Sequence, residues 1–283
     1  MLVHSLWTAP MLANKRGVDS NRQIESTIWC YASSVAYARR LCEPIKLYAD
    51  DYARELLDFL PYNEIHSLEV PAEIPTDFWA AGKFFALQQM DLMDIHIDGD
   101  VFIKSPDLMD LINYELSIND LIVQSIENSW TYENEYYIKC IELLRKNNIV
   151  LPNDLADCTP AYNCGLVGFN NEELKQKYIN HYLDSVKRVS ANTSAMREIK
   201  SSNDIWLDLI IEQQHLYALS ADYNVCNLLG TEEVEVYANA RKWGYQHLLG
   251  SEKWENLDKI KRQLYNLDRE IYNRVEKQLS KIL

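Results

Sequence analysis

Short apolar runs alternate with helical patterns through the first half of the chain. Four apolar runs predict β-strands, at residues 2–7, 45–49, 64–70 and 95–98. Apolar residues at three- and four-residue steps predict helices at residues 21–41 and 77–92. A further helix, YARELLDFL, follows Asp50 and Asp51, either of which can cap it. Strands separated by helices predict a largely parallel sheet, whose ligands bind at the carboxyl ends of the strands.

The second half of the chain is less regular. Apolar runs predict strands at residues 120–126, 161–170 and 232–238. Helical spacing predicts helices at residues 134–147, 172–189 and 203–219. Apolar residues then recur at three- and four-residue steps to the end, which predicts one amphipathic helix. Because no repeat or Gly/Ser linker divides the chain, we expect one α/β domain, residues 1–251, with the helix of residues 252–283 packed on it or on a partner.

Composition and charge narrow the function classes. The chain of 283 residues has a formal charge of −14 and is 47% hydrophobic, so we expect a sizeable core and no binding to nucleic acid. Six cysteines without a C-x-x-C pair indicate reduced thiols and a cytoplasmic protein. We expect no signal peptide and no transmembrane segment, because a basic leader is missing and no apolar run approaches about 18–20 residues.

The first candidate for chemistry interrupts an apolar run with two carboxylates. In DIHIDGDVFIKSP, Asp98 and Asp100 follow the predicted strand at residues 95–98, so they lie at its carboxyl end. Two hard oxygen ligands suit Mg²⁺ or Mn²⁺, and Gly99 between them would let a diphosphate approach the backbone. A turn whose aspartates bond to the backbone explains the same residues equally well.

The segment YQHLLGSEKW supplies a second set of candidates. His247 can ligate a metal alongside carboxylates, and Lys253 offers a positive charge to a phosphate. Gly250 gives a tight backbone whose N–H groups can meet that phosphate. Taken singly, His247 is more typical of a hydrogen-bonded polar side chain and Lys253 of a first-turn helix residue.

Two further segments carry polar groups among apolar residues. In YNCGLVGFNN, Asn163 offers the donor and acceptor groups that sugar hydroxyls need, and Gly165 leaves room for a ring. A core strand with a glycine bulge is the alternative. In IIEQQ, Glu212 and Gln213 follow an apolar run on a predicted helix, where a solvated helix face is the alternative.

Together and in this order, these motifs resemble the GT-A glycosyltransferases, in particular the retaining group that includes glycogenin and the bacterial lipopolysaccharide galactosyltransferases. The resemblance rests on the D-x-D of HIDGDVFI, the N-x-G of YNCGLVGF, the acidic–glutamine pair and the final H-x-x-G-x-x-K, over residues 95 to 254. The chain departs from the group in three places. Glu212 replaces the usual aspartate, no proline separates Lys253 from Trp254, and FWAAGKFFALQQM has Lys83 in place of the usual arginine.

The resemblance implies a GT-A fold for residues 1–251, with a mostly parallel sheet flanked by helices. It implies that Mn²⁺ or Mg²⁺ is held by Asp98, Asp100 and His247. The remaining site residues would bind a nucleotide-diphosphate sugar, with uridine as the usual base. The nucleotide and its phosphates would contact Trp7, Thr8, Ala9, Lys83, Gly250 and Lys253. The sugar and the reacting centre would face Asn163, Glu212 and Gln213.

The implied activity is transfer of a hexose, with retention, to a glycan or another hydroxyl acceptor. Several aromatic residues can line an acceptor groove or pack in the core: Trp130, Tyr132, Tyr136 and Tyr137. One alternative is a noncatalytic GT-A-like binding protein that uses the helix of residues 252–283 for oligomer or partner contacts. The other is a haloacid-dehalogenase-type phosphatase, which would use Asp98 as nucleophile and Asp100 as general acid. That class usually has Thr or Val where this chain has Phe102.

Overall fold

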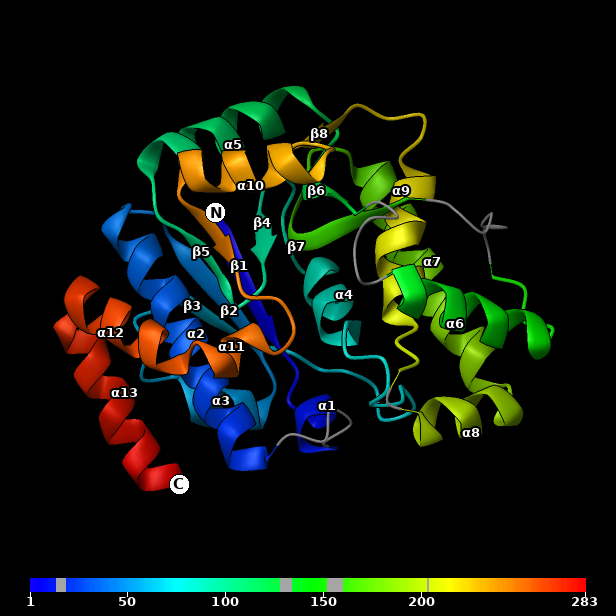
Figure 1. Ribbon diagram of the computed structural model, residues 1–283, viewed down its shortest axis with the longest axis horizontal. Coiled ribbons are helices and arrows are strands. Elements are labelled where there is room, and N and C mark those ends of the chain that lie inside the picture. Colours follow the sequence, from blue (N-terminus) through cyan, green and yellow to red (C-terminus); the bar gives the residue numbers. More distant parts are fainter. Residues whose placement is uncertain (14–18, 128–133, 152–159, 203) are drawn as a thin grey trace.

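The computed structural model describes residues 1–13, 19–127, 134–151, 160–202 and 204–283, and it has an α/β fold. A seven-stranded central sheet is flanked by helices on both faces (Figure 1). In spatial order its strands are β3 (Glu64–Ser67), β2 (Ile45–Ala49), β1 (Leu2–Leu6), β4 (Ile95–Ile97), β7 (Ala161–Phe169), β6 (Leu121–Glu127) and β8 (Val225–Asn227). A second sheet pairs β5 (Val101–Ile103) with β9 (Tyr245–His247).

The central sheet is mostly parallel, as the sequence predicts. The pairs β1–β2, β2–β3, β1–β4 and β6–β8 are parallel. The pairs β4–β7 and β6–β7 are antiparallel, so β7 runs against the other six strands. The register sets Ile97, the last residue of β4, opposite Leu166 in β7. The carboxyl end of β4 therefore lies beside the first half of β7.

Alternate strand residues face two separate hydrophobic cores. Leu2 and Leu166 belong to one core, whereas their neighbours Val3 and Val167 belong to the other. The first core is covered by helices α2 (Ser20–Arg40), α3 (Asp51–Leu57), α5 (Pro106–Ile118), α12 (Leu257–Leu267) and α13 (Arg269–Ile282). The second is covered by α4 (Ala81–Leu87), α6 (Asn134–Lys146), α7 (Glu172–Ser190), α8 (Thr193–Ser201), the π-helix η1 (Leu209–Gln214) and α9 (His215–Leu219).

Of two predictions for the first half of the chain, one is confirmed and the other gives a helix that is too long. Asp50 caps α3, because its carboxylate accepts a hydrogen bond from the Ala53 N–H at 2.8 Å. The helix predicted over residues 77–92 is much shorter, since α4 covers Ala81–Leu87. In the second half, the helix predicted over residues 203–219 divides into η1 and α9. The helices α5 and α8 and the strand β8 were not predicted.

The strand predicted over residues 232–238 is wrong, because this segment begins helix α10 (Glu233–Trp243). The alternation of Glu and Val mimics a strand, but the charges suit a helix. Glu233 and Glu235 lie in the first turn, and basic residues lie in the last, as the helix dipole favours. Gly244 then ends the helix in the left-handed conformation, at φ +67°.

The single helix predicted over residues 252–283 is also wrong, because the segment forms three helices. A short helix, α11 (Glu252–Glu255), is followed by α12 and α13. Asp268 ends α12 in an extended conformation and caps α13 by accepting the Ile271 N–H at 3.0 Å. The apolar faces of α12 and α13 pack on α2, burying Ile260, Leu264 and Val275. No helix in the described ranges is long and apolar enough to cross a membrane.

Candidate functional site

The two aspartates of the D-x-D motif join one sheet to the other. The residues Asp98, Gly99 and Asp100 lie between β4, in the central sheet, and β5, in the two-stranded sheet. The Asp98 N–H donates to the Gly165 carbonyl at 2.9 Å, and the Val101 N–H donates to the Asp98 carbonyl at 2.9 Å. The apolar run is thus two strands of different sheets, and the carboxylates occupy the turn between them.

His247 reaches the aspartates through the pairing of β5 with β9. Its register partner is Val101, the residue after Asp100. The His247 Nε2 lies 3.5 Å from Asp100 Oδ1, and one ligand atom from each of Asp98, Asp100 and His247 lies within 4.8 Å of the others. Residues separated by about half of the chain therefore form a compact set of two carboxylates and one imidazole.

Gln124 fixes the orientation of the His247 ring, although no role was predicted for this residue. Its Oε1 accepts hydrogen bonds from His247 Nδ1 at 2.9 Å and from the Tyr245 hydroxyl at 2.7 Å. Because an amide oxygen only accepts, Nδ1 carries a proton, and Nε2 is the nitrogen left to donate to Asp100 or, without its proton, to ligate a metal. A buried partner of this kind is typical of metal-binding histidines. The signal in the sequence is a polar residue inside the apolar strand DLIVQSI, where the register with β7 shifts.

Asp100 is buried yet remains ionised. Burial raises the pKa of its carboxyl, but the ion pair with Lys253 and the hydrogen bond from His247 outweigh it and bring the pKa below its usual value. Lys253 lies on α11, beside α2. The predicted phosphate-binding lysine is therefore adjacent to the carboxylates.

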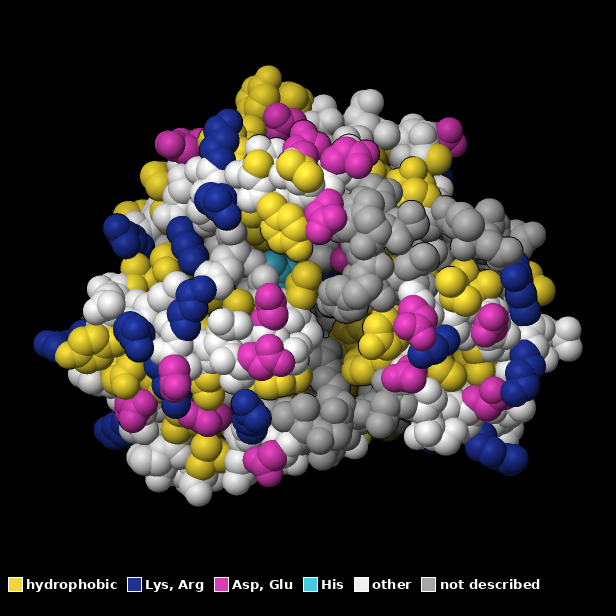
Figure 2. All heavy atoms as spheres, viewed as in Figure 1, with side chains coloured by type: hydrophobic (Ala, Val, Ile, Leu, Met, Phe, Trp, Pro, Cys, Tyr) yellow, Lys and Arg dark blue, Asp and Glu magenta, His cyan; other side chains and the backbone are white. Residues whose placement is uncertain are grey.

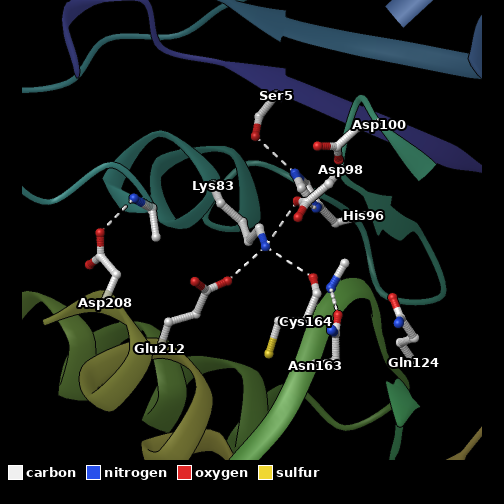
Figure 3. A network of polar contacts seen from close by, with 12 residues as sticks. Ser5, Lys83, His96, Asp98, Asp100, Gln124, Asn163, Cys164, Asp208 and Glu212 are labelled. Carbon is white, nitrogen blue, oxygen red and sulfur yellow. Dashed lines mark hydrogen bonds and ion pairs between the residues drawn. The ribbon is translucent and has the colours of Figure 1, made fainter. Parts of the chain in front are cut away.

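Lys83 forms the second charged centre of the site (Figure 3). Its buried ammonium lies 3.0 Å from Asp98 Oδ1 and donates to Glu212 Oε1 at 2.7 Å and to the Cys164 carbonyl at 3.0 Å. Burial lowers the pKa of Lys83, but the charges of Asp98 and Glu212 raise it by more. The pKa therefore lies above its ordinary value, and the ammonium stays charged. Burial raises the pKa of Glu212 above its ordinary value, although the positive charge of Lys83 acts to lower it. The geometry thus connects α4, the D-x-D turn, β7 and η1 through one side chain.

A buried aspartate holds α4 and η1 together. Asp208, directly before η1, accepts hydrogen bonds from the Ala80 N–H at 3.0 Å and from the Tyr182 hydroxyl at 2.8 Å. Since Ala80 directly precedes α4, this contact ties the starts of the two helices that carry Lys83 and Glu212. The π-helical turn of η1 is itself a conformation that is frequent at functional sites.

Asn163 and Gln213 belong to one hydrogen-bonded network. Asn163 Nδ2 donates to Glu127 Oε1 at 2.8 Å, and its Oδ1 accepts the Gly165 N–H at 3.0 Å. The Tyr137 hydroxyl donates to Gln213 Oε1 at 2.6 Å and lies 3.1 Å from Glu127 Oε2. Glu127, which was not predicted, therefore links the two predicted sugar-facing residues.

The structure gives the glycines different partners from those predicted. A Cβ on Gly165 would lie 2.4 Å from His247 Cε1, so the space beside Gly165 holds the imidazole and not a sugar ring. A Cβ on Gly99 would lie 2.1 Å from the Tyr31 ring, so this space holds Tyr31 and not a diphosphate. Gly250 differs, because it has φ +53° and nothing lies within 4 Å of its Cβ position. Its backbone remains open for a ligand.

The residues predicted to meet the nucleotide divide into two groups. Trp7 lines the cleft, but Thr8 and Ala9 do not. Thr8 is buried, and its N–H and hydroxyl donate to the Asp50 carboxylate at 2.7 and 2.8 Å. Thr8 also precedes the short helix α1 (Ala9–Leu12), so its polar groups hold the chain and do not face a ligand.

The two charged centres and most of the predicted site residues line one cleft with a volume of about 590 Å³. Figure 2 shows it as the hollow near the centre of the face, with a histidine side chain visible inside. The predicted residues that line it are Trp7, Lys83, Asp98, Asp100, Asn163, Glu212, Gln213, His247, Gly250 and Lys253. Of the predicted acceptor aromatics, Tyr136 lines the cleft and Tyr137 is buried beneath it. Trp130 and Tyr132 lie outside the described residues.

The chain belongs to a family of unknown function (DUF6734), whose model matches residues 1–278. No curated protein and no solved structure matches it. The match identifies the family without naming an activity, so the functional interpretation depends on the site.

Proposed function

We propose that the protein is a metal-dependent glycosyltransferase of the GT-A type. It would transfer a hexose from a nucleotide-diphosphate sugar, with uridine diphosphate as the expected carrier, to a glycan or another hydroxyl acceptor. The convergence of Asp98, Asp100 and His247 beside a cleft of about 590 Å³ carries this proposal. A mostly parallel sheet with the acidic turn at the carboxyl end of β4 supports it, because ligands of such sheets bind there.

The charges of the cleft support a divalent cation. Among the described lining residues, five carry carboxylates and two carry ammonium groups. The carboxylates belong to Asp77, Asp98, Asp100, Glu127 and Glu212, and the ammonium groups belong to Lys83 and Lys253. Both lysines are already paired with carboxylates. A diphosphate therefore needs an added cation to enter this cleft.

The residues present fit Mn²⁺ or Mg²⁺. Asp98 and Asp100 offer hard oxygen ligands, and His247 offers the Nε2 lone pair that its bond to Gln124 leaves available. An imidazole ligand favours Mn²⁺ over Mg²⁺. The bound cation would act as a Lewis acid that stabilises negative charge on the departing diphosphate.

The chain's own groups would position the nucleotide sugar. Lys253 and the open backbone of Gly250 lie where they can share the negative charge of the phosphates. Asn163 and Gln213, held by Glu127 and Tyr137, would orient the sugar hydroxyls. Glu212, fixed by Lys83, places a negative charge near the centre where positive charge develops.

A haloacid-dehalogenase-type phosphatase is less compatible with this geometry. Such an enzyme would need Asp100 to hold a proton and donate it as general acid. Lys253 and His247 instead bring the pKa of Asp100 below its usual value in spite of the burial that raises it. The nucleophile, Asp98, would also be held in an ion pair with Lys83.

A thermal-shift screen tests the proposal. Uridine, guanosine, adenosine and cytidine diphosphates are each added with Mn²⁺ or with EDTA. We expect one nucleotide to raise the melting temperature with Mn²⁺ only, because a ligand that binds the native state and not the unfolded chain stabilises the native state. Equal shifts in EDTA, or no shift with any nucleotide, would contradict the proposal. Metal-dependent binding without transfer or hydrolysis of the matching nucleotide sugar would instead identify a noncatalytic binding protein.

A further inference from the structure

We propose that Trp79 and Trp206 form a binding corner for a neutral carbohydrate, and that this carbohydrate is the acceptor. The inference deepens the proposed function and rests on it, because an acceptor has meaning only where a sugar is transferred. The two residues were not among those the sequence singled out. They line the same cleft as Asp98, Asp100 and His247.

The two indoles make an edge-to-face contact. Their ring centroids lie 5.3 Å apart and their planes cross at 70°. Both side chains are half-buried and line the cleft. Each ring face is a flat apolar surface with negative potential, which suits the weakly positive C–H face of a pyranose. Two rings at this angle can contact a sugar on two sides.

The corner is held close to the charged centre. Trp79 lies four residues before Lys83, and Trp206 lies six residues before Glu212. Asp208 accepts the Ala80 N–H at 3.0 Å, so it links the residue after Trp79 to the segment that follows Trp206. Trp79 lies two residues before α4, which carries Lys83, and Trp206 lies three residues before η1, which carries Glu212, so the same two linked segments supply the corner and the Lys83–Glu212 pair.

The charges near the corner select a neutral ligand. Asp77, two residues before Trp79, and Glu127 line the cleft, and the only ammonium groups among its described lining residues belong to Lys83 and Lys253. Both lysines are paired with carboxylates, so among the described lining residues no ammonium group is left to receive a phosphate or a sulfate of the acceptor. Carboxylates are good acceptors for sugar hydroxyls. Aromatic faces beside carboxylates fit a neutral glycan better than an anionic lipid headgroup or a nucleic acid.

Binding of methyl hexopyranosides and neutral disaccharides, followed by saturation-transfer NMR, tests the corner directly. We expect the wild-type protein to bind at least one of these probes. Trp79→Leu and Trp206→Leu keep an apolar side chain but lose the ring face, and each should weaken the binding about tenfold. Trp79→Phe, which retains an aromatic face, should restore most of it. Trp243→Leu, on α10 and outside the cleft lining, is the matched control and should bind as the wild type does.

The Mn²⁺-dependent thermal shift with a nucleotide diphosphate is measured on the same variants. We expect Trp79→Leu and Trp206→Leu to keep it, because the corner contacts the acceptor. If the wild type shows this shift but binds no carbohydrate probe, or binds it equally well in both leucine variants, the corner is overturned while the glycosyltransferase proposal stands. If the probe binds through both tryptophans but no nucleotide binds, the proposed function fails and the acceptor role fails with it. Should one leucine variant not fold, the other decides, because probe binding equal to that of the wild type in that variant would overturn the corner.

Discussion

Two histidines of this protein, His4 in β1 and His247 in β9, show why burial alone does not identify a site. The ring of His4 is bonded through both nitrogens, with Nδ1 2.9 Å from the Tyr62 hydroxyl and Nε2 3.0 Å from the Ser34 hydroxyl. His247 bonds through Nδ1 to Gln124, while its Nε2 lies 3.5 Å from Asp100 beside the cleft. The two histidines differ in the partner of Nε2, which is a hydroxyl for His4 and a carboxylate beside the cleft for His247.

The surroundings give the two rings different chemistry. Burial lowers the pKa of His4 to about 3, although the charge of Asp100 opposes the shift, and its hydroxyl partners are satisfied by a neutral ring. His247 faces a carboxylate that stays ionised. We therefore expect changes around His247 to alter metal binding, and changes at His4 to alter the pH dependence of stability.

The largest effect is expected for Asp100→Asn. The amide keeps the shape of the side chain but removes the negative charge that faces both His247 and Lys253. Loss of one of three ligands should reduce Mn²⁺ affinity more than about 100-fold, a larger loss than changes to residues that hydrogen-bond a metal ligand usually cause. Isothermal titration with Mn²⁺ measures it. Affinity equal to that of the wild type would remove Asp100 from the site.

Gly165→Ala should have the next largest effect. The added Cβ would overlap the His247 ring at 2.4 Å, so the ring must move away from Asp100. We expect a loss of Mn²⁺ affinity of about 10- to 100-fold. Gly168→Ala on the same strand is the control, because its Cβ would meet flexible side-chain atoms of Ile122 and Leu116 at 3.2–3.3 Å. If both variants bound Mn²⁺ alike, the ring position would not matter.

Gln124→Met tests the bond that orients His247. Methionine fills the space but accepts no strong hydrogen bond from Nδ1, so the preference for a lone pair on Nε2 is lost. We expect about a tenfold loss of Mn²⁺ affinity, at the lower end for such partners. Tyr245→Phe removes the other bond to Gln124 Oε1 and leaves the His247 bond intact, so its effect should be smaller. The reverse order of the two variants would contradict this role.

The smallest effect concerns His4 and appears in stability. Its pKa is about 3 in the folded protein and about 6.5 when unfolded, so between these values the unfolded chain binds a proton that the native state excludes. The free energy of unfolding therefore falls as the pH drops from about 6.5 towards 3, by at most about 1.4 kcal/mol per unit from this group. Urea titrations at several pH values should show a shallower fall for His4→Gln. His66→Gln, at a half-buried histidine, is the control, and equal slopes in both variants would exclude His4 as a source.

Most strands and the main candidate residues could be predicted from the sequence, because they rest on local patterns. Periodicity located β1, β2, β4, β6 and β7, and the D-x-D and H-x-x-G-x-x-K motifs located residues that the fold brings together. The local pattern gave a wrong prediction where contacts between distant parts of the chain determine the secondary structure. The exposed Val234 reads as part of a strand, but no strand pairs with it and the segment forms α10.

The supporting residues depend on register, which the sequence did not reveal. Gln124 faces His247 only because the register between β6 and β7 shifts beside it and because β9 pairs with β5. The partners of Lys83 come from three elements, and Gly165 makes room for an imidazole that lies 82 residues further along the chain. Thr8 was predicted to contact the nucleotide, but it donates a hydrogen bond to Asp50. Asp50 directly follows β2, the strand that pairs with β1.

Electron paramagnetic resonance of Mn²⁺ added to the wild-type protein and to His247→Ala tests the central claim most directly. If Asp98, Asp100 and His247 share one ion, the wild type should bind one Mn²⁺ per chain and show coupling to an imidazole nitrogen, and this coupling should be absent from His247→Ala. A wild-type protein that leaves Mn²⁺ free in solution, or a nitrogen coupling that persists in His247→Ala, would contradict the account.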